Sequence, residues 1–126
     1  MFKKNKVNVI TLGCSKNTFD SEVLMAQLKA NKFDVEHESM SDDAEIVIIN
    51  TCGFIENARK ESFEAIDQML ELKRSGKIRG VVVTGCLAER QHEKLLEERP
   101  EIDGLVGVFG RDEISDVVGR IMDGLD

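Results

Sequence analysis

The chain has no tryptophan, no tyrosine and only one proline among its 126 residues. Stacking of aromatic side chains on nucleic-acid bases would rest on six phenylalanines, several of which the core should claim. The formal net charge of −7 disfavours binding to a phosphate backbone or an anionic membrane surface. No apolar run approaches the roughly 18 residues of a membrane span, and the first is too short for a signal peptide. We expect no membrane partner and no direct nucleic-acid binding by this domain.

Cysteine is also scarce, with three residues in all: Cys14, Cys52 and Cys86. Three cysteines cannot close a disulfide framework, and the cytoplasmic location that we expect would keep them reduced. Their spacing lacks the paired C-x2-C pattern of structural zinc sites and the C-x-x-C pair of redox proteins. Glycine-rich phosphate loops of the Walker or GxGxxG type are absent as well. The chemistry therefore depends on what three separated thiols can do.

What the chain does contain is an alternation of strand-like apolar runs and amphipathic helical segments. With 41% hydrophobic and 33% charged residues it has the balance of one folded domain, which we expect over residues 1–126. Strands are predicted at Val7–Leu12, Lys32–Glu36, Ala44–Asn50, Gly80–Thr84 and Leu105–Phe109, and helices at Asp20–Ala30, Asn57–Lys73, Ala88–Glu98 and Asp112–Met122. This alternation predicts an α/β fold, namely a flavodoxin-like, doubly wound sheet of five parallel strands in the order 2-1-3-4-5, with helices on both faces.

Each cysteine follows a predicted strand directly, in the runs VNVITLGC, EIVIINTC and GVVVTGC. These are the first, third and fourth strands, which are consecutive neighbours in the expected order. Because neighbouring strands lie about 4.8 Å apart, the three strand ends should fall within roughly 10 Å of one another. They also straddle the point where the strand order reverses, where ligands bind in such sheets. The sequence thus predicts a site with three thiol ligands at one edge of the sheet.

Thiols that precede helices favour the thiolate form, and soft thiolates select zinc, copper(I) or iron–sulfur clusters. His37 and His92 are the candidates for a fourth ligand, but we interpret both as surface residues. A cluster with three protein ligands leaves one iron open to bind sulfur or substrate. Glycine adjoins each cysteine, at Gly13, Gly53 and Gly85, where it serves either close approach to a ligand or a tight turn.

Other interpretations of the cysteines remain open. A binding module of receiver or flavodoxin type could bury them as small core residues. A phosphocysteine carrier could use Cys14 alone. A phosphatase loop of the C-x5-R type is excluded, because Asp20, Ala58 and His92 stand where its arginine would be.

Several polar residues near the cysteines have two interpretations. Asn17, Asn50 and Thr51 either orient the cysteine segments or serve as turn and cap residues. Asp20 and Glu22 are predicted to open the first helix and complement its dipole.

Two charged segments lie outside these motifs. The lysines at positions 3, 4 and 6 are predicted to form a solvated tip, and the acidic run from Glu36 to Glu45 a solvated loop.

The segments LGCSKNTFDSE, INTCGFIENARKES and VTGCLAER around the three cysteines resemble the N-terminal domain of the radical S-adenosylmethionine methylthiotransferases. The resemblance covers essentially the whole chain. The residues Gly-Cys-Ser-Lys-Asn at 13–17 and Asn-Thr-Cys-Gly-Phe-Ile at 50–55 are similar to the RimO-type branch, which modifies an aspartate of a small-subunit ribosomal protein. The tRNA-modifying branch, with Gly-Cys-Gln-Met-Asn and Asn-Thr-Cys-Ser, is the alternative.

The resemblance implies that Cys14, Cys52 and Cys86 ligate an auxiliary 4Fe–4S cluster with one open iron. It also implies a radical domain in cis, with a second 4Fe–4S cluster and S-adenosylmethionine, and a C-terminal substrate-binding domain. The C-x3-C-x2-C motif of that radical domain does not occur in these 126 residues. We therefore expect methylthiotransferase activity from a longer protein and no catalysis from this chain alone.

Overall fold

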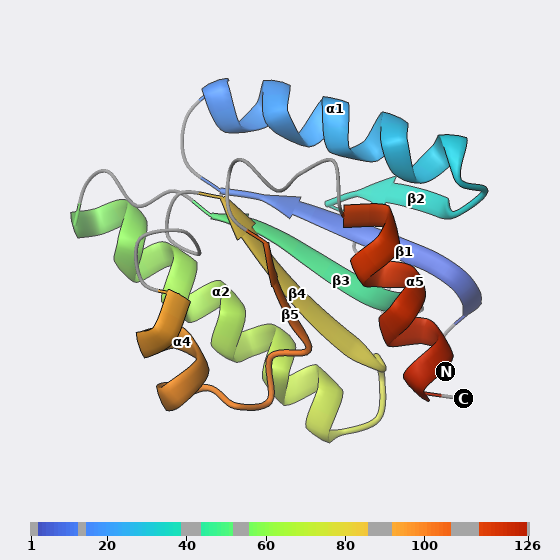
Figure 1. Cartoon of the computed structure of the whole chain (residues 1–126). Coiled ribbons are helices and arrows are strands. Elements are labelled where there is room, and N and C mark those ends of the chain that lie inside the picture. Colours follow the sequence, from blue (N-terminus) through green and yellow to red (C-terminus); the bar gives the residue numbers. More distant parts are fainter. Residues whose placement is uncertain are drawn as a thin grey trace.

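The computed structural model describes residues 3–12, 15–38, 44–51, 56–85, 92–106 and 114–125. These residues contain five strands, β1 (Lys3–Thr11), β2 (Asp34–His37), β3 (Ala44–Thr51), β4 (Gly80–Gly85) and β5 (Gly104–Val106), and four helices, α1 (Ser15–Ala30), α2 (Glu56–Arg74), α4 (His92–Glu98) and α5 (Ile114–Leu125). Strands and helices alternate along most of the chain, as the sequence predicts (Figure 1). None of the helices in these ranges is long and apolar enough to cross a membrane.

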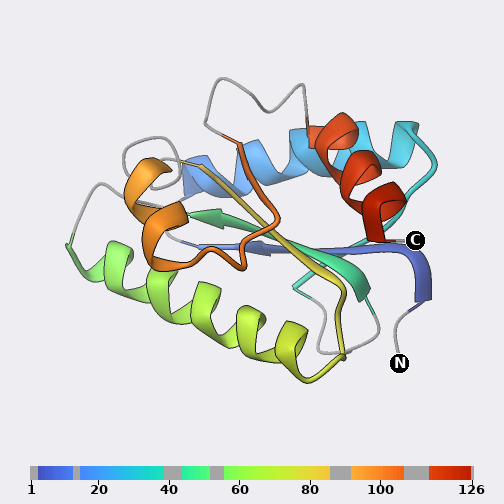
Figure 2. The same ribbon diagram turned by 60° about the horizontal axis from the view of Figure 1, so that its bottom comes forward.

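The five strands form one parallel sheet in the order β2-β1-β3-β4-β5. This order confirms the predicted doubly wound arrangement and places the three cysteine-bearing strands side by side. Helices α1 and α5 cover one face of the sheet, and α2 and α4 cover the other (Figure 2). The central strands are therefore shielded on both faces, which explains why all eight residues of β3 are buried.

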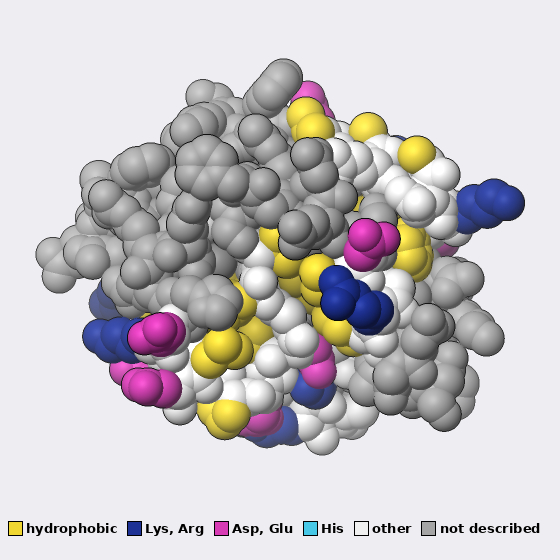
Figure 3. Space-filling view, viewed as in Figure 1, with side chains coloured by type: hydrophobic (Ala, Val, Ile, Leu, Met, Phe, Trp, Pro, Cys, Tyr) yellow, Lys and Arg dark blue, Asp and Glu magenta, His cyan; other side chains and the backbone are white. Residues whose placement is uncertain are grey.

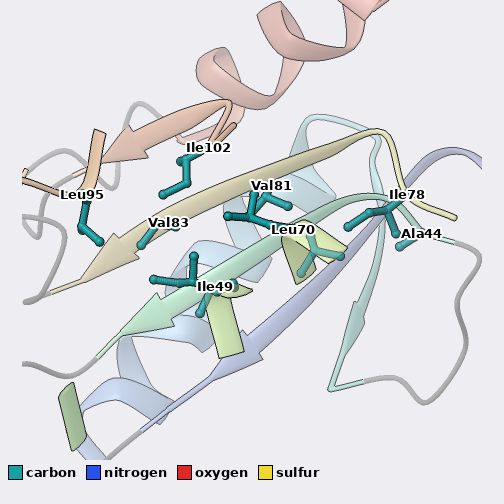
Figure 4. Close-up of a cluster of buried hydrophobic side chains, with 10 residues drawn as sticks. Ala44, Ile49, Leu70, Ile78, Val81, Val83, Leu95 and Ile102 are labelled. Atoms are coloured by element: carbon teal, nitrogen blue, oxygen red, sulfur yellow. The ribbon is translucent and has the colours of Figure 1, made fainter. Parts of the chain in front are cut away.

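The core has two halves, because successive side chains of a strand point to opposite faces. Ile46, Ile48 and Val82 pack with Leu24 and Leu28 of α1. The other face carries the cluster drawn in Figure 4, in which Leu70 of α2 and Leu95 of α4 contact strand residues; its members are Ala44, Val47, Ile49, Ile66, Leu70, Ile78, Val81, Val83, Leu95 and Ile102. Each fully buried aliphatic side chain of this kind contributes about 1.5–3 kcal/mol.

Helix α1 begins at Ser15, five residues before the predicted start at Asp20. The prediction that Asp20 and Glu22 open the helix was wrong, since its first turn contains no acidic residue. The prediction placed the helix start near Val23, where the apolar pattern begins. That pattern marks the residues that face the sheet, but the helix itself extends into the polar turns before it. Helix α4 begins at His92, and residues 88–91 of its predicted range lie outside the described residues, as do residues 107–109 of the fifth predicted strand.

Charged residues near the start of the sheet are less exposed than the sequence suggests. Lys6 lies within β1 with a side chain only 5% exposed, and its Nζ is 2.9 Å from Glu36 Oε1 in β2. Glu45 of β3 is 2% exposed and pairs with Arg79 at 3.0 Å. The predicted solvated tip and solvated loop were therefore wrong at these positions, because each buried charge has a partner brought to it by strand pairing.

Helices α2 and α4 are joined at the surface by mixed charges. The Arg99 guanidinium lies 4.8 Å from the centre of the Phe63 ring, and its Nε donates to Asp67 Oδ1 at 2.7 Å. Arg74, the last residue of α2, has its Nη2 2.6 Å from Oε1 of Glu101, which lies between α4 and β5. Figure 3 shows basic and acidic side chains interspersed over this part of the described surface.

Candidate functional site

The candidate site is the edge of the sheet where β1, β3 and β4 end. Thr11 of β1 pairs with Asn50, and Thr51 of β3 pairs with Gly85 of β4, so the three strands end nearly level. The Leu12 N–H extends the pairing beyond β1 and donates to the Asn50 carbonyl at 3.0 Å. Figure 1 shows these three strand ends together at one edge. The predicted convergence of the three strands that precede the cysteines is thereby confirmed.

The cysteines lie just beyond the described strand ends. Cys52 directly follows Thr51, Cys86 directly follows Gly85, and Cys14 is three residues after Thr11. All three thiols fall outside the described residues, so their role as ligands stays a prediction. Within the described ranges no group of three or more His, Cys, Asp or Glu side chains is arranged to hold a metal ion.

A buried hydroxyl links two of these strand ends to a helix. The Ser21 side chain in α1 is fully buried, and its Oγ accepts hydrogen bonds from Thr11 Oγ1 at 2.7 Å and from Asn50 Nδ2 at 2.9 Å. Asn50 is itself only 3% exposed. Buried polar groups are stable only when they are bonded, and here two strands and a helix satisfy one another.

His37 extends this set of contacts to the edge strand. Its Nε2 lies 2.8 Å from Thr11 Oγ1. Which of the two atoms donates depends on the tautomer of the imidazole. The neighbouring Glu38 accepts from the Thr11 N–H through Oε1 at 3.4 Å. His37 is exposed, as predicted, but the sequence did not reveal that it contacts the end of β1.

Thr51 and Gly85 hold β3 against β4 at the site. Thr51 Oγ1 donates to the Thr84 carbonyl at 2.7 Å. Gly85 has a φ of +98°, and a Cβ there would clash with the Thr51 carbonyl and lie 2.8 Å from the Thr51 nitrogen. A glycine is required here because its φ is positive and the backbones of β3 and β4 meet closely. Gly13 and Gly53 lie outside the described residues.

The arrangement fits a group held by three thiolates. Three adjacent parallel strands deliver three cysteine-bearing segments to one edge, and α1 begins directly after Cys14, where its unpaired N–H groups favour an anion. The last described side chains of β1 and β3, Thr11, Asn50 and Thr51, are neutral, whereas the exposed carboxylate of Glu38 lies beside Thr11 and accepts from its N–H. An anionic, thiolate-ligated group would meet no repulsion from Thr11, Asn50 or Thr51.

Sequence reasoning singled out Asn50, Thr51 and His37 but missed Ser21 and Thr11, and it did not predict the contact of His37 with Thr11. One signal could have found Ser21, because it lies at i−3 and i−7 from the buried Leu24 and Leu28 and so shares their face of α1. A small polar residue on a buried helical face needs a polar partner. The side chains of Asn17 and His92 lie outside the described residues, so their predicted roles stay predictions.

Comparison with known proteins adds independent information. Residues 6–107 match the model of the uncharacterized protein family UPF0004. The ribosomal protein uS12 methylthiotransferase RimO of Christiangramia forsetii is 53% identical over 105 residues, which cover 83% of this chain and 23% of that protein. The proteins of the same name from Porphyromonas gingivalis and Lachnoclostridium phytofermentans are 47% and 40% identical, and each match covers 94% of this chain and 27% of the relative. The chain thus spans about a quarter of the length of these relatives.

A solved structure shares the fold. Rubredoxin oxygen:oxidoreductase from the anaerobe Desulfovibrio gigas superposes with a TM-score of 0.57 at 12% identity, covering 98% of this chain and 37% of that chain. At this identity the likeness concerns the fold alone.

Proposed function

We propose, from the premise that this chain belongs to the uncharacterized protein family UPF0004, that it is the auxiliary iron–sulfur domain of a methylthiotransferase acting on a ribosomal protein. The observation that carries the proposal is the adjacency of β1, β3 and β4, the strands that lead into Cys14, Cys52 and Cys86. The relatives named as uS12 methylthiotransferases supply the reaction class and favour a ribosomal protein over tRNA as the substrate.

Cys14, Cys52 and Cys86 are the residues proposed to hold the auxiliary 4Fe–4S cluster. Such a cluster, when bound by three thiolates, would supply an open iron able to hold the sulfur that is transferred. The chain's own part is to present three thiolates at one edge of a rigid sheet. Helix α1 begins at Ser15, and a helix start favours the thiolate form of a thiol that precedes it.

The remaining chemistry is assigned to other parts of a longer protein. A radical domain in cis would hold a second 4Fe–4S cluster and S-adenosylmethionine, and a further domain would bind the aspartate-bearing loop of uS12. This division agrees with the quarter of the relatives' length that the chain spans. The chain alone should therefore bind the auxiliary cluster without modifying a ribosomal protein.

Anaerobic reconstitution tests the cluster assignment. The reduced chain, incubated with ferrous iron and sulfide and then desalted, should retain about four irons, the content of one 4Fe–4S cluster. Cys52→Ser should lose most of this iron, because one of three ligands is removed. The matched control is Ser62→Ala, which alters a buried serine of α2 on another element of the fold. A colourless parent chain that keeps three free thiols after this treatment would overturn the proposal.

A further inference from the structure

The ends of the three central strands are tied together by a small set of buried polar contacts. Ser21 Oγ is the shared acceptor for Thr11 of β1 and Asn50 of β3, at 2.7 and 2.9 Å. Both donors lie in the last two residues of their strands. Ser21 therefore fixes the position of the end of β1 along the strand direction relative to the end of β3, and it holds α1 against both strands.

Asn50 carries the link on to β4. Its Nδ2 donates to Ser21, while its Oδ1 lies 2.7 Å from where a Cβ of Gly85 would stand, so the amide fits against the glycine backbone. Gly85 has no side chain to keep β4 away, and the two strand ends approach closely. One amide thus contacts the helix on one side and the end of β4 on the other.

Polar contacts are a costly way to hold a helix on a sheet. Apolar side chains of similar size would pack at this buried position with no polar groups to satisfy. A set of hydrogen-bonded side chains, in contrast, has all its donors and acceptors paired in only one arrangement of the strands and the helix. It therefore specifies the register of the strands as well as their contact with the helix. That specificity is useful where the segments after the strands must hold one group together.

We infer that Ser21 and Asn50 are positioning residues for the three-cysteine site. By holding the ends of β1, β3 and β4 level, they set the starting points of the segments that carry Cys14, Cys52 and Cys86. Neither residue ligates the bound group; each acts through the cysteines. The inference rests on the proposed function, because it assumes that the three cysteines bind one group.

Cobalt(II) is a suitable probe, since its thiolate complexes have strong charge-transfer absorption and need neither sulfide nor assembly of a cluster. The reduced chain is titrated with Co²⁺ under anaerobic conditions at a temperature where unfolding curves show every variant to be folded. Partners that support metal ligands typically change metal affinity about 10- to 100-fold. Ser21→Ala and Asn50→Ala should therefore each weaken Co²⁺ binding by about 10-fold or more. The double variant should bind Co²⁺ only slightly more weakly than either single variant, because both single variants remove the Ser21–Asn50 hydrogen bond.

Ser62→Ala is the matched control, since Ser62 is as completely buried in α2 as Ser21 is in α1. It should change Co²⁺ affinity less than about 2-fold even if it lowers stability, because Ser62 lies in α2, on the face of the sheet opposite Ser21 (Figure 2). Equal affinities for Ser21→Ala, Ser62→Ala and the parent would overturn the positioning role and leave the proposed function intact. Failure of the parent to bind Co²⁺ through its cysteines would overturn both.

Discussion

At the amino end of the sheet charged side chains form ion pairs, whereas at the carboxyl end of the central strands the bonded side chains of Thr11, Ser21 and Asn50 are neutral. Glu45 at the start of β3 pairs with Arg79 just before β4, and Asp103 just before β5 pairs with Lys73. At the other end, Thr11, Ser21 and Asn50 bond to one another. The first end has ion pairs within the chain, while the second has neutral, hydrogen-bonded side chains where three thiolates are predicted. The difference agrees with the proposal that the carboxyl end holds an anionic group.

The amino end should respond most strongly to loss of a charge. Glu45→Ala removes a carboxylate that is 2% exposed and abolishes its ion pair with Arg79. Breaking such a pair should lower the free energy of unfolding by about 3 kcal/mol, measured by urea denaturation. Glu64→Ala, at an exposed position of α2, is the control and should change it by less than about 0.5 kcal/mol. Co²⁺ affinity should be unchanged in both; a loss confined to Glu45→Ala would show that the two ends are coupled.

At the carboxyl end of the sheet, a substitution of Gly85 should disturb the packing of β3 against β4 most directly. Gly85→Ala must combine a positive φ with a clash against the backbone of Thr51, and we expect a loss of about 2–3 kcal/mol of stability. Gly76→Ala isolates the effect of φ, since Gly76 has a φ of +83° and no atom within 4 Å of the added Cβ. It should lose only about 1 kcal/mol. Gly85→Ala alone should also weaken Co²⁺ binding. Equal losses of stability for the two variants would refute the close approach of β3 and β4.

The smallest effect is expected at the exposed pair of Arg74 and Glu101, which lies at the surface of the amino end beside Lys73 and Asp103. A hydrogen bond from Arg74, followed by its charge, holds the pKa of Glu101 below its ordinary value. A carboxyl with a lowered folded pKa stabilises the fold above its unfolded pKa, and this contribution is lost as the pH falls through the folded pKa. Glu101→Gln should therefore reduce the acid sensitivity of the urea midpoint slightly. Glu97→Gln on exposed α4 serves as the control, and an equal change in both variants would contradict the assignment to this pair.

Much of the fold could be predicted from the apolar runs, because strands buried on both faces produce continuous hydrophobic segments such as Ala44–Asn50. The strand order followed from chain connectivity and a preference for right-handed crossovers. Predictions were weaker for charged residues. Lys6 and Glu45 are buried, because strand pairing and register bring a partner to each: Glu36 to Lys6 and Arg79 to Glu45.

The sequence by itself determined the alternation of strands and helices, the parallel sheet and the position of each cysteine after a central strand. These features depend on local patterns and on general rules of connection. Only the tertiary structure decided which polar groups meet at those strand ends. Ser21 is 10 residues from Thr11 and 29 from Asn50 along the chain. Its single side-chain oxygen can bond to both only when α1 is packed on the sheet and β1 and β3 are in register. Hydrogen bonds need distances accurate to a few tenths of an ångström, which no spacing along the chain can specify.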